Sequence, residues 1–146
     1  MQARIKRLYP LLPTYQTPDS AAFDIAANAD TIIPARGFAK VSTGLVIEAP
    51  EGHFLLIAAR SSLALKTGLL LANGIGIVDR DYAGPTDEIL ISLYNPGEKP
   101  VLVQRGDRIA QGLFLKVTQA EWQESDMLRP ENRGGFGSTG GYQNLP

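Results

Sequence analysis

Glycine and proline interrupt this chain along its whole length, and this feature most limits the folds that it can adopt. The sequence has 15 glycines and 10 prolines among 146 residues. Both residue types end or bend regular elements, so a long helix has no room to form. The intervals are short and rich in apolar and β-branched residues, as in "HFLLIAA" at 53–59 and "EILISLYN" at 88–95. Short strands separated by frequent turns predict an all-β sandwich or barrel.

Three segments allow more specific predictions. Residues 38–49 carry apolar or threonine side chains at every second position from Val41 to Ile47, which predicts one half-buried strand. The nearly continuous apolar run at 88–94 predicts a strand buried on both faces. Only "SSLALKTG", at 61–68, is typical of a helix, with Ser61 or Ser62 capping its start and Gly68 ending it.

Composition excludes several classes of protein. The length favours one domain, and an apolar content of 44% can fill its core. Fourteen basic against fifteen acidic residues, with no long basic run, argue against a nucleic-acid partner. No apolar segment is long enough to span a membrane, and no signal peptide is recognisable, so we expect a soluble, cytoplasmic protein.

The absence of cysteine excludes disulfides, thiolate catalysis and zinc–thiolate sites. His53 is the single histidine, and its place in "PEGHF" predicts a surface or edge residue. A transition-metal site and a Ser–His–Asp triad therefore lack support. The carboxylates remain able to support a magnesium site, because Mg²⁺ prefers oxygen ligands and substrate phosphates.

Polar residues that are typical of active sites fall into five short blocks. In "ARSSLALK", at 59–66, Arg60 and two serines precede the predicted helix. Together with the first helical N–H groups they suit an anion. An ordinary helix cap beside a surface arginine explains the same residues.

A second block, "NGIGIVDRDYAG" at 73–84, favours a glycine-flanked β-hairpin. On an extended strand Asp79 and Asp81 would share one face, where a carboxylate could activate water or hold a metal through water. Turn chemistry is the alternative, since aspartate is common in turns. For the turn and Gln111 in "RGDRIAQGLF" (105–114), and for Asp24 in "DSAAFDIAA" (19–27), a structural role is the simpler interpretation.

The last block, "NRGGFGSTGGY" at 132–142, has the glycines of a phosphate cradle, because glycine lets backbone N–H groups face an anion. No helix follows it, unlike an ordinary phosphate loop. Apolar residues become sparse after about residue 125. We therefore expect a β domain at 1–125 and a flexible C-terminal arm at 126–146.

Taken in order, the five blocks closely resemble the motifs of the trimeric dUTPases (dUTP diphosphatases). The motif-like segments are "AAFDIAA", "ARSSLALK", "GIVDRDYAG", "GDRIAQGLF" and "GGFGSTG", which span residues 21–140. The resemblance implies a jelly-roll subunit of the β-clip type with one short helix, assembled as a homotrimer with active sites between subunits. It also implies Mg²⁺-dependent hydrolysis of dUTP to dUMP and pyrophosphate.

The resemblance further implies a role for individual residues. Asp79 matches the aspartate that activates the water attacking the α-phosphorus. Tyr82 matches the tyrosine that lies against the deoxyribose, and Phe136 matches the aromatic residue that stacks on uracil. Uracil itself would be bound by the hairpin residues Asn73, Gly74, Ile77 and Val78.

For the triphosphate, the resemblance implies a set of binders divided between the β domain and the arm. Asp24 matches an aspartate near the water shell of the metal, with Mg²⁺ held mainly by the substrate phosphates. The arm would close over the site as a lid. The matching phosphate binders are Arg60, Ser61, Ser62, Gln111, Arg133, Gly137, Ser138 and Thr139.

Two alternatives share this resemblance. "RSSL" is similar to a motif of the related dCTP deaminases, so a deaminase-type or bifunctional nucleotide enzyme of the same fold is one alternative. The glutamate that deamination needs is replaced by Ser92, however, and Glu88 is a different position in the chain. The other is a non-catalytic nucleotide-binding trimer, which would not need the carboxylate of Asp79.

Three features depart from the family pattern. Ala22 replaces a usual glycine. The segment 84–95 is longer than in the family, which predicts a bulge in the strand after the aspartates. Glu131 occupies the usual position of the arm's arginine, so either Arg133 or Arg129 is the candidate for the γ-phosphate.

Overall fold

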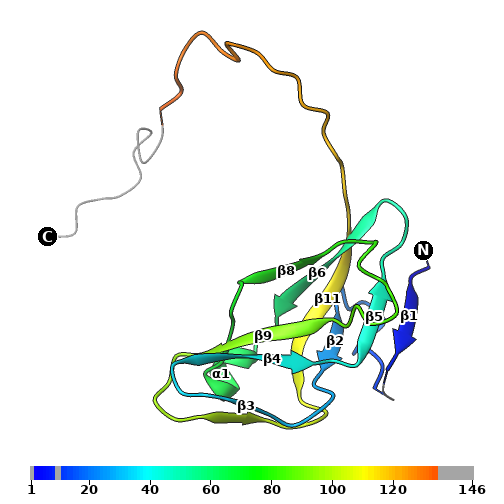
Figure 1. Cartoon of the computed structure of the whole chain (residues 1–146), viewed down its shortest axis with the longest axis vertical. Coiled ribbons are helices and arrows are strands. Elements are labelled where there is room, and N and C mark those ends of the chain that lie inside the picture. Colours follow the sequence, from blue (N-terminus) through cyan, green and yellow to red (C-terminus); the bar gives the residue numbers. More distant parts are fainter. Residues whose placement is uncertain (1, 9–10, 135–146) are drawn as a thin grey trace, which may run out of the picture.

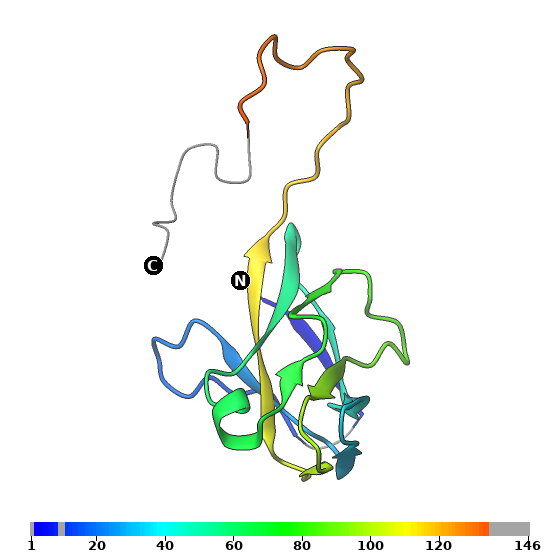
Figure 2. The ribbon, with the colours of Figure 1, turned by 90° about the vertical axis from the view of Figure 1, so that its left-hand side faces the viewer.

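The chain folds into a small body of short antiparallel strands, and residues 117–134 extend away from this body (Figures 1 and 2). The structure is a computed structural model, and it describes residues 2–8 and 11–134. In this part of the chain no helix is both long enough and apolar enough to cross a membrane. The strands are β1 (Arg4–Arg7), β2 (Phe23–Ala26), β3 (Thr31–Ile33), β4 (Gly37–Ser42), β5 (Leu45–Glu48), β6 (His53–Ala59), β7 (Leu70–Leu71), β8 (Ile75–Val78), β9 (Leu90–Asn95), β10 (Val101–Val103) and β11 (Arg108–Lys116).

These strands form four sheets, all of them antiparallel. The largest has the order β2-β11-β6-β8, and a three-stranded sheet has the order β4-β9-β7. Two-stranded pairs, β1 with β5 and β10 with β3, complete the body. Neighbours in the sheets are often distant in sequence, as expected for a jelly roll. The all-β prediction is therefore confirmed, with α1 (Leu63–Thr67) the one helix among the described residues.

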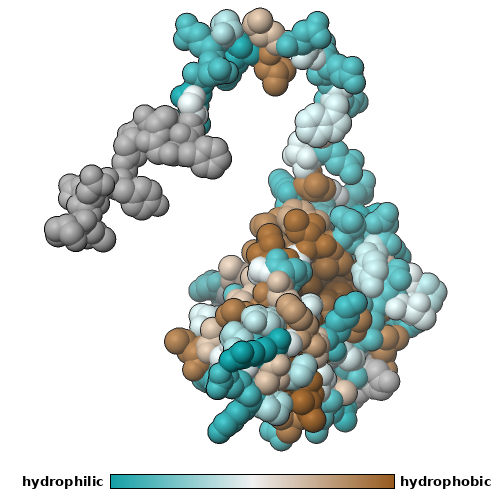
Figure 3. All heavy atoms as spheres, turned by 60° about the vertical axis from the view of Figure 1, so that its left-hand side comes forward, coloured by the Kyte–Doolittle hydropathy of each residue, from teal (hydrophilic) through white to brown (hydrophobic). Residues whose placement is uncertain are grey.

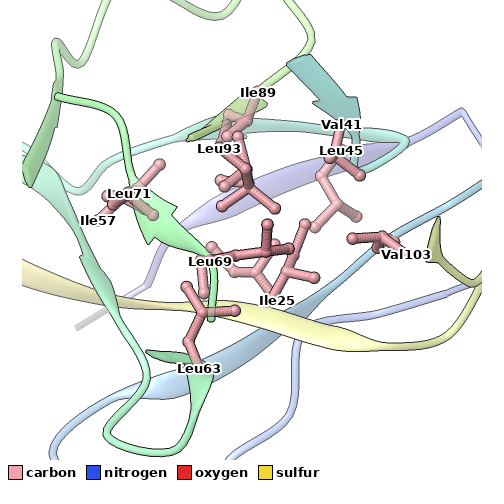
Figure 4. Packing of buried hydrophobic residues seen from close by; sticks show 14 of the residues in the cluster. Ile25, Val41, Leu45, Ile57, Leu63, Leu69, Leu71, Ile89, Leu93 and Val103 are labelled. Carbon is pink, nitrogen blue, oxygen red and sulfur yellow. The ribbon is translucent and has the colours of Figure 1, made fainter. Parts of the chain in front are cut away.

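The hydrophobic core fills the space between the two larger sheets (Figure 4). Ile25 on β2 and Ile57 on β6 meet Val41 on β4 and Leu93 on β9 there, and none of the four side chains is more than 4% exposed. Burial of apolar surface on this scale is the main force that holds the sheets together.

The predicted strand over 38–49 is wrong as a single element, because the chain divides into β4 and β5. Gly44 has a φ of 68°, which breaks an extended strand. Thr43 lies at the break, where its Oγ1 donates to the carbonyl of Ile89 at 2.7 Å and accepts from the N–H of Leu45 at 3.2 Å. These bonds satisfy a hydroxyl that is only 1% exposed.

β9 is not buried on both faces in this chain, contrary to the prediction. Ile91 and Leu93 are buried while Leu90 is 45% exposed, which is the alternation of a strand with one covered face. Its pairing with β4 runs without a break from Leu90 to Asn95, so the predicted bulge is also absent. The loop that precedes β9 spans residues 79–89.

The helix prediction is correct, but its start differs in detail. Gly68 ends α1 with a φ of 73°, and its N–H donates to the carbonyl of Ala64 at 2.8 Å. Ser62 stands at the N-cap without a hydrogen bond from its side chain. Its backbone is already helical (φ −91°, ψ −6°), whereas a capping side chain needs the extended backbone that aims its oxygen at the next turn.

Candidate active site

The turn from β7 to β8 and the strand β8 carry the residues expected to bind a pyrimidine. Gly74 adopts a φ of 69° in this turn, and the carbonyl of Asn73 accepts the N–H of Ile75 at 2.8 Å. β8 then pairs with β6, with Ile77 opposite Leu56. The predicted hairpin is wrong in this respect, because β8 does not pair with the strand that follows it. It pairs instead with β6, and β8 itself forms the edge of the larger sheet.

A cavity of about 280 Å³ lies between β8, β9 and the loop that joins them. Asn73, Ile77, Val78 and Tyr82 all line it, so four of the expected base and sugar residues come together in a single chain. Gly76 and Ile57 form part of its wall, and a Cβ added at Gly76 would lie 3.2 Å from Cβ of Ile57. The remaining lining residues are Lys40, Glu88, Ile89, Leu90 and Ser92.

Asp79 lies outside that cavity. β8 ends at Val78, and the carbonyl of Asp79 accepts the N–H of Tyr82 at 3.2 Å, so Asp79 and Asp81 stand in a turn instead of on an extended strand. Both aspartates line a neighbouring hollow of about 590 Å³, together with His53 and Arg80. Asp79 thus directly follows Val78, the last residue of β8 that lines the cavity.

The expected phosphate binders of the β domain gather around Asp24, where β2, β11 and the end of β6 meet. Nε of Arg60 donates to Oδ1 of Asp24 at 2.7 Å, and Nη1 of Arg108 donates to Oδ2 at 3.1 Å. Gln111 lies opposite Asp24 in the β2–β11 pair, and its Nε2 donates to the carbonyl of Ala59 at 2.9 Å. The Asp24 side chain is 9% exposed, which suits a buried charge only because two arginines flank it.

Ser61 and Ser62 follow Arg60 directly and lead into α1. None of these residues, nor Gln111 or Asp24, lines the cavity that holds Asn73 and Tyr82. One chain therefore carries two separated halves of the expected site.

Residues 117–134 extend away from the body after β11 ends at Lys116 (Figure 2). Residues 118–134 form no helix or strand, and Arg129 and Arg133 are exposed. The other expected arm residues, Phe136, Gly137, Ser138 and Thr139, lie outside the described residues.

The surroundings of Asp24 fit a magnesium ion that is bound through water. Over residues 2–8 and 11–134, no group of three or more histidine, aspartate or glutamate side chains could hold a metal. Both carboxylate oxygens of Asp24 are bonded to arginines, yet each retains the capacity to accept a further hydrogen bond. Asp24 can therefore accept a bond from a metal-bound water without a direct bond to the metal.

Four polar residues near the site were not among the site residues expected from the sequence. Arg108 completes the pair of arginines on Asp24. Lys40 and Ser92 lie opposite each other in the β4–β9 pair and both line the cavity, and Glu88 lines it from the loop before β9. The sequence contains no local signal for such neighbours, because they are brought together by strand pairing.

Comparison with known proteins gives a consistent result. The dUTPase family model matches residues 10–140. The chain is similar to the deoxyuridine 5'-triphosphate nucleotidohydrolase of Desulfitobacterium hafniense, with 47% identity over 90% of this chain and 88% of that protein. Among solved structures, the dUTPase of Streptococcus mutans is 28% identical, covers 84% of this chain and all of its own length, and has a TM-score of 0.77. Staphylococcus bacteriophage 80alpha dUTPase with dUPNHPP has a TM-score of 0.84 at 20% identity, over 95% of this chain and 98% of its own.

Proposed function

This chain belongs to the dUTPase family and is a dUTP nucleotidohydrolase with a jelly-roll fold, and from that premise we propose how its residues share the reaction. The observation that carries the proposal is the 280 Å³ cavity lined by Asn73, Ile77, Val78 and Tyr82. It brings the residues expected to contact base and sugar to one place, next to the turn that carries Asp79.

In the cavity, the exposed polar groups of the backbone at 74–78 bind the edge of uracil. Uracil offers two carbonyl acceptors and one N–H donor, whereas cytosine presents an amino group in place of a carbonyl. A site built for the first pattern leaves buried groups unpaired against the second, which can discriminate by ~10⁴–10⁵. The Tyr82 ring, flat against the deoxyribose, leaves no room for a 2′-hydroxyl.

Asp79 acts as the general base. Its carboxylate accepts a proton from a water whose oxygen forms a bond to the α-phosphorus, while the bond from that phosphorus to the bridging oxygen breaks. The electrons of the broken bond leave with pyrophosphate, and dUMP remains. Proximity and charge neutralisation make up most of the catalysis of such transfers.

The triphosphate is bound by Arg60, Gln111 and the N–H groups near Ser61 and Ser62. Asp24 holds Arg60 in place through their 2.7 Å ion pair. Mg²⁺, bound to the phosphates, would neutralise their charge and withdraw electrons from the phosphorus that is attacked. The arm, with Arg133 or Arg129 and with Phe136, Gly137, Ser138 and Thr139, closes over the bound nucleotide and excludes bulk water.

The separation of the two halves of the site supports a homotrimer in which neighbouring subunits supply them. Ile75 on β8 is 49% exposed and does not line the cavity, and an exposed apolar surface of this kind can mark the place where a second subunit packs. Figure 3, in which the side of β8 in Figure 1 comes forward, shows a broad hydrophobic area on the body. Light scattering on a size-exclusion column tests this directly: the proposal requires three chains of 15.8 kDa in one particle.

Product analysis tests the activity and separates it from the alternatives. The protein is incubated with dUTP, dCTP, dTTP or UTP in the presence of Mg²⁺, and parallel samples contain a chelator. Formation of dUMP and pyrophosphate from dUTP alone, abolished by the chelator, supports the proposal. Ammonia from dCTP would indicate a deaminase, and binding of dUTP without turnover would indicate a nucleotide-binding trimer.

The cavity itself argues against deamination. Ser92, not a carboxylate, lines it at the β9 position. The carboxylate of Glu88 accepts hydrogen bonds from Ser42 and Gly44, so it is engaged in the structure of the loop.

A further inference from the structure

A carboxylate in the loop between β8 and β9 ties that loop to the turn between β4 and β5. Oε1 of Glu88 accepts a hydrogen bond from Oγ of Ser42 at 2.5 Å and another from the N–H of Gly44 at 2.7 Å. Glu88 is half-buried and also lines the cavity. Hydrogen bonds to an ionised acceptor are about twice as strong as neutral ones, so Glu88 contributes a strong side-chain link between the loop and the turn.

The backbone on either side of Glu88 is held as well. The N–H of Ile89 donates to the carbonyl of Leu45 at 2.8 Å. On the other side, Oδ2 of Asp87 accepts the N–H of Gly84 at 2.7 Å, which closes the turn that precedes Glu88. Residues 84–88 thus form a turn that is held by hydrogen bonds at both ends.

The anchored backbone carries a bond to the tyrosine of the site. The hydroxyl of Tyr82 donates to the carbonyl of Glu88 at 3.3 Å, and both residues line the 280 Å³ cavity. Tyr82 is 44% exposed, so packing alone holds its ring only on one side. The position of the Glu88 carbonyl therefore contributes directly to the orientation of the ring.

We propose that Glu88 is a positioning residue which, by fastening its loop to Ser42 and Gly44, holds the Tyr82 ring where it excludes ribonucleotides. The inference rests on the proposed function, in which that ring lies against the deoxyribose. Glu88 touches neither the reacting phosphorus nor the water. Loss of the Glu88 carboxylate therefore lowers the selectivity for dUTP over UTP more than it lowers the rate of the chemical step.

The test compares Glu88→Ala with Glu88→Gln, measuring kcat and KM for dUTP and for UTP. In Glu88→Ala the N–H of Gly44 and the hydroxyl of Ser42 lose their acceptor, so the Tyr82 ring is held less firmly. We expect the ratio of kcat/KM for dUTP to kcat/KM for UTP to fall roughly tenfold, mostly because the KM for UTP decreases. Glu88→Gln retains an oxygen that accepts the same bonds, so its ratio stays within about threefold of wild type. The matched control is Glu98→Ala, which removes an exposed carboxylate paired with Arg36 far from the cavity and leaves the ratio unchanged.

A double-mutant cycle with Tyr82→Phe shows whether Glu88 acts through the tyrosine. We expect Tyr82→Phe to lower the ratio and the double variant to lower it no further, because both changes remove the same restraint. Additive effects, or an unchanged ratio in Glu88→Ala, would refute the inference. Should Glu88→Ala fail to fold, judged by its thermal unfolding midpoint, Ser42→Ala removes one of the two bonds and must lower the ratio by a smaller factor.

The outcome separates this inference from the function on which it rests. Wild-type protein that leaves dUTP intact would refute the proposed function, and this inference with it. Wild-type turnover of dUTP with a ratio that is insensitive to Glu88→Ala would refute the role of Glu88 alone.

Discussion

Arg60 and Asp24 form an ion pair in which Nε lies 2.7 Å from Oδ1, although the residues are 36 positions apart in the sequence. The pair joins the end of β6 to β2. Arg60, a proposed phosphate binder, is therefore held in place by Asp24, which by its resemblance to the family is expected near the water shell of the metal. Arg108 holds the second oxygen of the same carboxylate at 3.1 Å, so Asp24 organises two cations at once.

We expect Asp24→Asn to lower both the stability of the protein and its activity towards dUTP. The amide keeps the shape of the carboxylate, but it leaves Arg60 and Arg108 without a negative partner. Removal of one member of such a partly buried group lowers the free energy of unfolding by about 1.5–3 kcal/mol. Separately, Arg60 loses its fixed position, and kcat/KM for dUTP should therefore fall about tenfold or more. Thermal unfolding and steady-state kinetics measure the two effects, with the exposed Asp19→Asn as control. Wild-type kinetics in Asp24→Asn would contradict the role of this pair.

Asp79→Asn should abolish most turnover while dUTP still binds. The amide cannot accept the proton of the attacking water, and loss of a general base costs about 10²–10⁴ in rate. Asp79 lies outside the cavity that holds Asn73 and Tyr82, so the affinity for a non-hydrolysable dUTP analogue should stay close to that of the wild type. Calorimetric titration measures the affinity and pyrophosphate release the rate. Asp81→Asn serves as the neighbouring control, and a normal rate in Asp79→Asn would exclude it as the base.

Deletion of residues 130–146 should leave the body folded but reduce turnover. β11 ends at Lys116, and the body makes its core without the arm, so the unfolding midpoint should not change. Loss of the groups that close over the phosphates should cost about a hundredfold in kcat/KM. Full activity of the truncated protein would refute the lid.

The single variants Arg129→Ala and Arg133→Ala, in the full-length chain, decide which arginine contacts the γ-phosphate. If Arg133 makes that contact, Arg133→Ala should reproduce part of the loss seen on truncation, which removes Arg133. If Arg129 makes it, Arg129→Ala should lower the activity towards dUTP in addition, because the truncated protein retains Arg129. The other variant then serves as its matched control. Wild-type activity in both single variants would show that neither arginine makes this contact.

Gly112→Ala should destabilise the protein through overpacking. A Cβ at this position would lie 2.6 Å from Cε2 of Phe23 and 3.1 Å from Cδ1 of Leu55, and both of these side chains are buried. Insertion of a methyl group into such a space costs about 1–3 kcal/mol. Chemical denaturation of the variant measures this, with the exposed Lys116→Ala on the same strand as control. An unchanged free energy of unfolding would show that Phe23 can move aside.

The elements that depend on local chemistry were predictable from the sequence. Gly68 ends the helix because a left-handed residue is needed there, and short apolar segments between turn residues became strands. The order of the five motifs likewise indicated the family, which the family model over residues 10–140 confirms. Where a second local signal was overlooked, the prediction failed: Gly44 divides β4 from β5 by its positive φ.

The amino-acid sequence by itself determined the fold class, the family and the residue types that the site offers. Only the tertiary structure decided which of those residues meet: Arg108 with Asp24 across 84 positions, Glu88 with Gly44 across 44, and Val78 inside a cavity that leaves Asp79 outside. The physical reason is that a residue's turn or strand preference arises from its own side chain and near neighbours. A hydrogen bond between strands instead requires a pairing and a register that the whole core selects, because one register buries the apolar faces of all strands together.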